Sequence, residues 1–346
     1  MKKNKQNIFI LGFPAPVAGI SSDFFLKNNF NVTLLIDESD TNNIHLKQWG
    51  KKYNSTLHIV KGTSSSIDFA LSGKDYLELA KQTDFIIACH SITSVKTRSF
   101  YKAEVKELIE FCKASQKKAS IVYFSTLTVS GNFSGIFSEK DLETGQNFTD
   151  SLQEGLFYAE RILNKFKDQI NSCIVRTALP VGNRDYIFPL ILFMSIESEI
   201  FFKFGHKYFL FTPLKQIELF YKVFLKEPDT LFLPSSRTLH LFTKSKLSSG
   251  ELTKKIYENA HKEISTFFDI KKAAKTVIDI KNYSDQMDMV IKNIFVKQHD
   301  DTDISNKWST EFLSTFLNRQ DRRFLLNIFK WDDIIETAVE KIAGFR

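Results

Sequence analysis

Short runs of β-branched and aromatic residues alternate with longer stretches of helical periodicity through the first half of the chain. Two of the longer stretches, Val17 to Lys27 and Tyr101 to Cys112, place apolar residues on one helical face. Strands that alternate with helices in this way form parallel sheets covered on both sides. The pattern therefore predicts an α/β fold with a doubly wound parallel sheet, whose strands are Asn7 to Leu11, Asn31 to Asp37, Thr56 to Val60, Asp84 to Ile87, Ser120 to Phe124 and Cys173 to Arg176.

The second half of the chain has a different pattern. Residues 183–280 are rich in Phe and Leu, which predicts a smaller lobe, and the remainder shows helical faces such as Trp308, Phe312 and Phe316. Further helical faces are expected over residues 290–295 and 335–342. We therefore divide the chain into a sheet domain (1–182), segments of a smaller lobe (183–280) and a helical C-terminal extension (281–346).

Composition narrows the possible partners. The 346 residues include 34 Phe, which are spread at core-like spacings and are interpreted as packing. The net charge of +7 permits an acidic partner, but 47 basic residues are scattered among 40 acidic ones. Since no arginine-rich run, zinc spacing or aromatic-basic motif accompanies them, nucleic-acid binding is not expected.

Cysteine usage and hydropathy indicate a cytoplasmic protein. The three cysteines, Cys89, Cys112 and Cys173, are far apart and odd in number, as expected of reduced thiols. The longest apolar stretch, Ile187 to Met194, is well short of the ~20 residues that a membrane span requires. The polar segment that begins at His299 is interpreted as a solvated loop, so no metal site is predicted.

A glycine-containing turn joins the first predicted strand to the first helix. It reads Gly12-Phe-Pro-Ala-Pro-Val-Ala-Gly19, the place at which a Rossmann-type domain binds pyrophosphate through backbone N–H groups. Pro14 and Pro16 each lack that donor, although Pro16 is compatible with the first helical position. Asp37 ends the second strand, where a carboxylate can accept hydrogen bonds from ribose hydroxyls.

The segment from Ala119 to Leu163 carries a family resemblance. Its strand ends in Ser125, Thr126 and Thr128, and Gly131 follows. This pattern resembles the STxSVxG segment of extended short-chain dehydrogenase/reductase (SDR) proteins, and the following FSEKDLETGQN is similar to the thioester reductase branch, which reduces carrier-bound acyl thioesters. Arg176 and Gly182 match the RPGxVxG segment that ends the cofactor domain in that family. The resemblance implies a Rossmann-type sheet with a smaller substrate lobe.

The resemblance also shows which catalytic groups are missing. The family has a Tyr and, four residues later, a Lys in a Tyr-x-x-Ser-Lys-x-x-Ala-Glu pattern, and Ala159-Glu160 fixes the register here. Leu152 then occupies the Tyr position, Gly155 the Ser position and Leu156 the Lys position, while Thr126 falls on the catalytic Ser/Thr. No Tyr in the chain has a Lys four positions on.

The cofactor positions depart from the family as well. The Thr-Gly-x-x-Gly-x-x-Gly pattern retains only its first glycine in register, with Gly19 one residue late. Asp37 stands where the relatives usually carry an Arg for the 2′-phosphate of NADP, so NAD is favoured if any dinucleotide binds. His90 is expected at the carboxyl edge of the sheet, either as a structural or as a catalytic residue. By the resemblance, His90 stands where the family has Ala, Tyr101 where it has a structural Asn, and Glu104 where it has Gly. The candidate cofactor positions are Gly12, Ala15, Ala18, Asp37, Thr63 and Ala88.

Three functions remain open. The first is a pseudo-reductase that binds an acyl carrier, a biosynthetic enzyme or a metabolite without transferring hydride. The second is a working NAD(P)-dependent oxidoreductase, or a non-redox enzyme, that uses Thr126 or His90 in the same crevice. The third is a structural subunit that acts through its helical tail. The sequence does not predict the oligomeric state.

Overall fold

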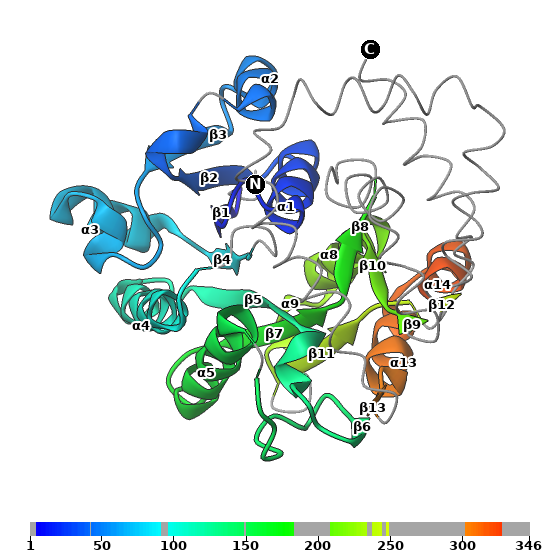
Figure 1. Ribbon diagram of the computed structural model, residues 1–346. Coiled ribbons are helices and arrows are strands. Elements are labelled where there is room, and N and C mark those ends of the chain that lie inside the picture. The colour runs from blue at the N-terminus through cyan, green and yellow to red at the C-terminus, as the bar shows by residue number, and fades with distance from the viewer. Residues whose placement is uncertain are drawn as a thin grey trace, which may run out of the picture.

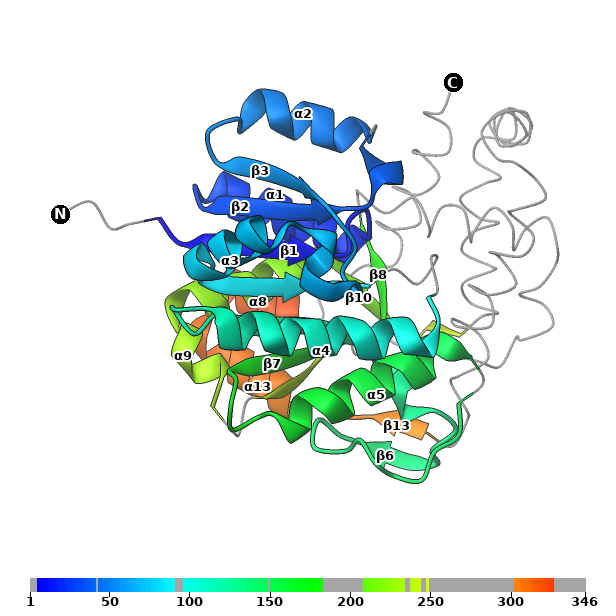
Figure 2. The same cartoon turned by 90° about the vertical axis from the view of Figure 1, so that its left-hand side faces the viewer.

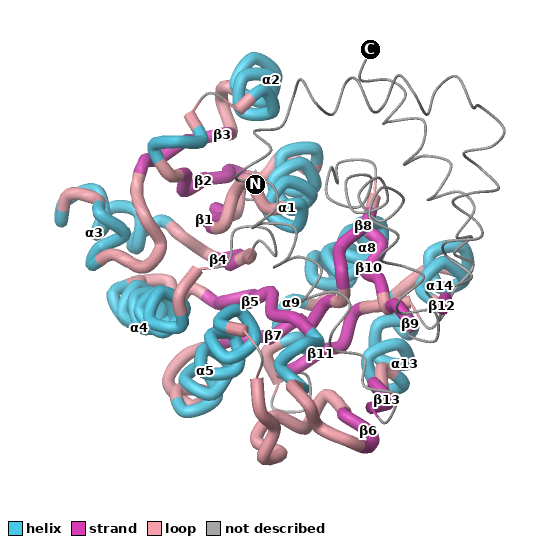
Figure 3. Tube along the Cα trace, viewed as in Figure 1, coloured by secondary structure: helices cyan, strands magenta, loops and turns pink. Residues whose placement is uncertain are grey.

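A computed structural model describes residues 5–41, 43–90, 96–148, 150–182, 208–233, 237–243, 247–248 and 302–326. Its centre is a parallel sheet of seven strands in the order β11-β7-β5-β4-β1-β2-β3 (Figures 1 and 3). The six strands from β7 to β3 have the order of a doubly wound dinucleotide-binding sheet. β11 is an additional strand at the edge, next to β7. The strands are β1 (Asn7–Leu11), β2 (Asn31–Ile36), β3 (Leu57–Lys61), β4 (Phe85–Ala88), β5 (Ser120–Thr126), β7 (Ser172–Thr177) and β11 (Thr238–Leu241).

Helices cover both faces of the sheet (Figures 1 and 2). One face carries α3 (Gly73–Gln82), α4 (Arg98–Ala114) and α5 (Ser151–Lys165). The other carries α1 (Pro16–Lys27), α8 (Leu214–Lys226), α13 (Lys307–Phe316) and α14 (Arg319–Leu325), while α2 (Ile44–Lys52) and α9 (Pro228–Leu231) lie at the periphery. Each face buries its own apolar cluster, because both sides of a parallel strand are covered.

Side-chain caps fix where the helices on the α4 face begin. The side chains of Ser72, Thr97 and Asp150 accept hydrogen bonds from backbone N–H groups in the first turns of α3, α4 and α5. Such caps satisfy donors that the helix itself leaves free and contribute about 1 kcal/mol each. The start of α4 matters most for the site, because the first turns of this helix form one wall of the pocket described below.

In the described part of the chain, three short strand pairs lie outside the main sheet. β8 (Leu179–Val181) pairs with β10 (Phe211–Pro213), and β9 (Tyr208–Phe209) pairs with β12 (Leu247–Ser248). β6 (Gly135–Phe137) pairs with β13 (Thr302–Ile304), which brings the C-terminal part of the chain against the first half. Figure 2 shows β6 and β13 side by side below α5.

The predicted α/β fold with a doubly wound parallel sheet is confirmed, and Pro16 is the first residue of α1 as the turn allowed. The helical faces expected over residues 290–295 and 335–342, and most of the lobe over residues 183–280, lie outside the described residues. The three-part division of the chain stays a prediction. In the described ranges no helix has the length and apolarity that crossing a bilayer demands.

Candidate functional site

A pocket opens where the carboxyl ends of β1, β2 and β4 meet the first turns of α4. This edge is where ligands bind in doubly wound sheets. Its volume is about 250 Å³. The lining residues come from five segments: Gly12, Phe13 and Pro14; Leu35, Asp37, Ser39 and Asp40; Gly62 and Ser64; Cys89 and His90; and Lys96, Phe100, Tyr101 and Glu104.

The turn after β1 lines the pocket and makes a hydrogen bond within itself. Gly12 has a φ of +91°, and a Cβ at this position would lie 1.9 Å from the carbonyl oxygen of Cys89, so only glycine fits. The N–H of Ala15 donates to the carbonyl oxygen of Gly12 at 2.9 Å. Pro14 and Pro16 lack an N–H. The turn therefore presents few of the backbone donors that a phosphate group requires.

His90 and Glu104 form a buried pair on the pocket wall. The Nε2 atom of His90 lies 3.4 Å from Oε1 of Glu104, and the two side chains are 5% and 2% exposed. The other oxygen of Glu104 accepts a hydrogen bond of 2.5 Å from the Ser64 hydroxyl. Among the described residues, neither His90 Nε2 nor Glu104 Oε1 has a hydrogen-bond partner. The two atoms face each other at a distance longer than a normal hydrogen bond, so each keeps capacity for a further partner.

Burial keeps both members of this pair neutral over most of the acidic range. Desolvation raises the pKa of Glu104 to about 7, against the opposing effect of the Ser64 hydrogen bond. Desolvation lowers the pKa of His90 to about 3. The two groups therefore form an ion pair at no pH, because His90 loses its proton long before Glu104 does. Above about pH 7, Glu104 is an anion beside a neutral imidazole.

Asp37 and Asp40 add further negative charge at the pocket rim. Asp37 accepts a hydrogen bond of 3.1 Å from the hydroxyl of Thr63. Burial, followed by the charge of Asp37, raises the pKa of Asp40, and the ammonium group of Lys96 opposes this rise. A raised carboxylate pKa beside another carboxylate indicates negative charge that the protein has not fully compensated.

Tyr101 fills the space between the pocket and α5. Its hydroxyl accepts a hydrogen bond of 3.3 Å from the N–H of Lys96, and its ring contacts that of His90 edge-on. A Cβ added at Gly155 would lie 2.3 Å from Cδ2 of Tyr101. Gly155, which replaces the Ser of the family pattern, therefore makes room for an aromatic ring that replaces the structural Asn.

The positions of the missing catalytic pair lie in the apolar core. Leu152 and Leu156 on α5 are 1% and 0% exposed, and they belong to the cluster beneath α4 and α5. Thr126 ends β5, and its hydroxyl shares a hydrogen bond of 2.5 Å with that of Thr128. Thr126 does not line the pocket, so the structure does not bring it together with His90.

The candidate cofactor positions separate into two groups. Gly12 and Asp37 line the pocket together with His90, and Thr63 contacts Asp37 from behind. The other three are enclosed by apolar packing instead: Ala15 at 2%, Ala18 at 0% and Ala88 at 0% exposure.

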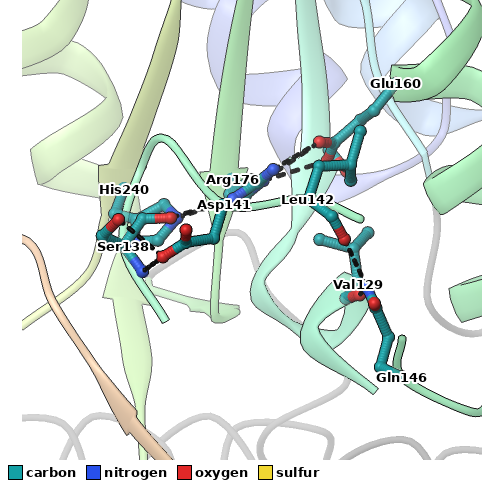
Figure 4. A network of polar contacts seen from close by, with 9 residues as sticks. Val129, Ser138, Asp141, Leu142, Gln146, Glu160, Arg176 and His240 are labelled. Carbon is teal, nitrogen blue, oxygen red and sulfur yellow. Dashed lines mark hydrogen bonds and ion pairs between the residues drawn. The ribbon is translucent and has the colours of Figure 1, made fainter. Parts of the chain in front are cut away.

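A second buried polar cluster surrounds Arg176 on β7, next to a groove whose lining includes Arg176. Figure 4 shows Arg176 between Glu160 and His240. The guanidinium of Arg176 donates three hydrogen bonds of 2.8 to 3.2 Å to the carboxylate of Glu160, which also accepts a 2.5 Å bond from Ser125. Arg176 lies 3.1 Å from Nε2 of His240, whose Nδ1 donates to the carbonyl of Ser305 at 2.6 Å. Each of these polar groups has a partner, so this cluster is structural.

A complete dinucleotide does not fit the pocket as the described residues form it. The volume of about 250 Å³ is below the ~300–1,000 Å³ typical of sites for drug-sized ligands. His90, Tyr101 and Glu104 project where the family has Ala, Asn and Gly. Carboxylates also outnumber the single lysine in the lining, which disfavours a pyrophosphate.

Sequence reasoning found His90 but missed Glu104, Ser64, Tyr101 and Asp40. One signal was available for Glu104, because it lies on the face of α4 that buries Tyr101 and Leu108. A carboxylate on an otherwise apolar helical face is rarely buried without a reason. The contact with Ser64 joins residues 40 positions apart and had no local signal.

Comparison with known proteins gives one family match, over part of the chain. Residues 32–186 match the model of the NAD-binding family described as male sterility protein, and the matched range begins after the Gly12 turn. No curated protein sequence matches the chain.

Solved structures share the fold. One is the terminal R domain from the myxalamid PKS-NRPS biosynthetic pathway, at 13% identity and a TM-score of 0.71, covering 100% of this chain and 93% of that one. Another is the reductase domain of a nonribosomal peptide synthetase from Mycobacterium tuberculosis, at 12% identity and a TM-score of 0.65, covering 99% and 93%. The yeast methylglyoxal/isovaleraldehyde reductase Gre2, complexed with NADPH, has 10% identity and a TM-score of 0.63, covering 98% and 99%.

Proposed function

Because the chain is an extended SDR of the thioester reductase-like branch, we propose that it is a pseudo-reductase, a protein that keeps the fold and binds a partner without transferring hydride. One observation carries the proposal. The positions of the family's Tyr and Lys are occupied by Leu152 and Leu156, which are buried in the apolar core. In the relatives the Tyr donates a proton and the Lys lowers the pKa of that Tyr. A leucine side chain does neither.

The surroundings of α5 support the same proposal. Tyr101 and Gly155 pack against each other beside Leu152, so the space of the lost polar groups is filled. Thr126 is bonded to Thr128 rather than to a charged group that would tune its hydroxyl. General acid catalysis contributes ~10²–10⁴-fold, and the loss of an electrostatic stabiliser costs a comparable factor. Reduction by the family route is therefore expected to fall below detection.

A nicotinamide cofactor is the ligand that the matched family suggests, and Gre2 is a relative in complex with NADPH. The closed turn at Ala15 and the side chains that narrow the pocket lead us to expect weak binding or none. If a dinucleotide binds, Asp37 favours NAD over NADP, because the carboxylate of Asp37 would repel the negatively charged 2′-phosphate of NADP.

The similar structure from the myxalamid pathway is a terminal R domain, and that from Mycobacterium tuberculosis is the reductase domain of a nonribosomal peptide synthetase. By this analogy we propose an acyl carrier, a biosynthetic enzyme or a metabolite of such a pathway as the partner. The cytoplasmic location indicated by the cysteines stays a prediction.

Single-turnover assays test the proposal. Purified protein is mixed with acyl thioesters and with NADH or NADPH, and the loss of nicotinamide absorbance is followed. We expect no turnover from the unmodified chain, and none from the double variant Leu152→Tyr with Leu156→Lys, because the phosphate turn stays closed. Calorimetry is expected to give dissociation constants weaker than micromolar for both dinucleotides. Clear turnover by the unmodified chain would refute the pseudo-reductase.

A second candidate function rests on the His90–Glu104 pair. A buried carboxyl group whose pKa is about 7 is suited to general acid–base chemistry in a non-redox enzyme. This alternative predicts that Glu104→Gln abolishes an activity which Leu152 and Leu156 variants leave intact. A screen of thioester and ester hydrolysis with both sets of variants separates the two candidates.

A further inference from the structure

We propose that the pocket at the carboxyl ends of β1, β2 and β4 binds a compact organic cation, a protonated primary amine, whose ammonium group binds the carboxylate of Glu104, with Asp37 and Asp40 adding negative charge to the lining. The inference rests on the proposed function in one respect, since it requires that no dinucleotide fills the crevice. It goes beyond that function because it assigns the pocket a positively charged ligand, whereas a dinucleotide is negatively charged.

The charge of the lining favours a cation. Asp37, Asp40 and Glu104 face a space of about 250 Å³, and Lys96 is the one cationic side chain among the described lining residues. His90 contributes no charge near neutral pH, because its pKa is lowered to about 3. Burial, and after it the charge of Asp37, raises the pKa of Asp40, so the two carboxylates repel each other. An ammonium group would relieve that repulsion.

The hydrogen-bonding capacity of the wall is unfilled. Glu104 Oε1 and His90 Nε2 are buried and lie 3.4 Å apart, and neither makes a hydrogen bond within the described part of the chain. A buried polar atom without a partner is uncommon in native proteins and calls for a ligand, a water or a functional role. An ammonium group carries three donors, which suits carboxylate oxygens.

The apolar part of the lining fits the remainder of an amine. Phe13, Pro14, Phe100 and Tyr101 contribute apolar and aromatic walls. Aromatic faces attract organic cations, and aliphatic carbons gain by leaving water. A metal ion is a poorer occupant, because no group of three or more His, Cys, Asp or Glu side chains in the described part of the chain has the arrangement to hold one.

The titratable groups around the pocket determine whether amine binding tightens or weakens as the pH rises. They are Asp37 and Asp40 after β2, Cys89 and His90 after β4, and Lys96, Tyr101 and Glu104 on the α4 side. Burial raises the pKa values of the Cys89 thiol and the Tyr101 phenol, so both stay neutral through pH 8. Glu104 becomes an anion as the pH passes about 7. Amine binding is therefore expected to tighten from pH 6 to pH 8.

Calorimetry with defined probes tests the proposal on the full chain. The probes are n-butylamine and 1,4-diaminobutane, with 1-butanol and 1,4-butanediol as neutral counterparts and ADP as an anion. At pH 8 we expect saturable binding of at least one amine, with its alcohol counterpart at least tenfold weaker and ADP weaker still. Glu104→Gln is expected to weaken amine binding at least tenfold and to remove its rise between pH 6 and pH 8.

Matched variants make the outcome decisive. Glu110→Gln changes an exposed carboxylate of the same helix and is expected to leave amine binding unchanged. If Glu104→Gln does not fold, Asp40→Asn serves in its place, with an expected loss of at least threefold. Equal affinity for butanol, tighter binding of ADP, or no saturable amine binding up to 10 mM, a ceiling of about 3 kcal/mol, would each overturn the inference. Any of these results together with absent thioester reduction would leave the pseudo-reductase proposal standing.

Discussion

The protein buries two clusters that each contain a histidine and a glutamate, and the two differ in how fully their polar atoms are paired. In the cluster of Arg176, Glu160 and His240, both carboxylate oxygens and both imidazole nitrogens have partners. In the pair of His90 and Glu104, one atom of each side chain has none. A saturated network stabilises a fold, whereas an unsaturated one at a pocket is poised to bind.

The same difference follows the family resemblance. Glu160 and Arg176 are residues that match the family patterns, and they form the saturated cluster. Tyr101, Glu104 and Gly155 are departures from those patterns, and they gather at the pocket and behind it. The residues that match the family stabilise the sheet, and the residues that depart from it change the shape of the ligand crevice. Three predictions sharpen this contrast.

The largest effect is expected at the saturated cluster. Arg176→Met removes the guanidinium and leaves Glu160 as an unpaired buried carboxylate, which costs about 3–5 kcal/mol of unfolding free energy. Urea unfolding followed by circular dichroism measures the loss. The matched control is Arg161→Met, since the pair of Arg161 with Glu143 is exposed and such pairs contribute about 0–1 kcal/mol. Equal losses for the two variants would contradict the assignment of a structural role to Arg176.

The second effect concerns the pH dependence of stability at the unsaturated pair. Glu104 has a folded pKa of about 7 against 4.5 in the unfolded chain, so the folded state holds the extra proton and stability falls as the pH rises between these values. His90 has a folded pKa of about 3 against 6.5, so its contribution rises with pH between about 3 and 6.5. The two slopes oppose each other across the range from 4.5 to 6.5.

Glu104→Gln is therefore expected to expose the slope of His90. Relative to the unmodified chain, the variant should gain about 3 kcal/mol of unfolding free energy as the pH rises from 4.5 to 7. Unfolding curves at half-unit pH steps measure the difference, with Glu110→Gln as the control that follows the unmodified chain. A constant difference between variant and unmodified chain over this range would show that Glu104 is ionised in the folded state throughout.

The smallest effect is expected at the packing that fills the lost catalytic space. Gly155→Ala places a Cβ against the Tyr101 ring and should cost about 1–3 kcal/mol in spite of the better helix propensity of alanine. Gly19→Ala in α1 is the matched control, because its Cβ would meet nothing within 4 Å, and it should stabilise by up to about 1 kcal/mol. Thermal unfolding gives both signs. Stabilisation by Gly155→Ala would indicate that Tyr101 is free to move.

Much of the fold was predictable because parallel strands covered on both faces are continuous apolar runs. Ile8 to Leu11 and Ile121 to Phe124 are such runs, and both lie in the sheet as expected. The loss of the catalytic pair could also be predicted from the sequence, since Ala159-Glu160 fixes the register of α5. Only part of the pocket could be predicted. His90 was placed by its position after a strand, but its contact with Glu104 depends on how α4 packs against the sheet.

The position of Ser309 also bears on the order in which the chain folds during synthesis. Its hydroxyl donates to Glu139 at 2.7 Å and accepts from the N–H of His240 at 2.9 Å, across separations of 170 and 69 residues. Chains generally begin to fold from the N-terminus as they emerge, and contacts between distant residues form slowly. All seven strands of the sheet precede Ser309 in the chain, so β11 is synthesised before the segment that hydrogen-bonds to it. A nascent chain that extends past β11 but stops short of Ser309 therefore contains every strand of the sheet and lacks the hydrogen bond to His240.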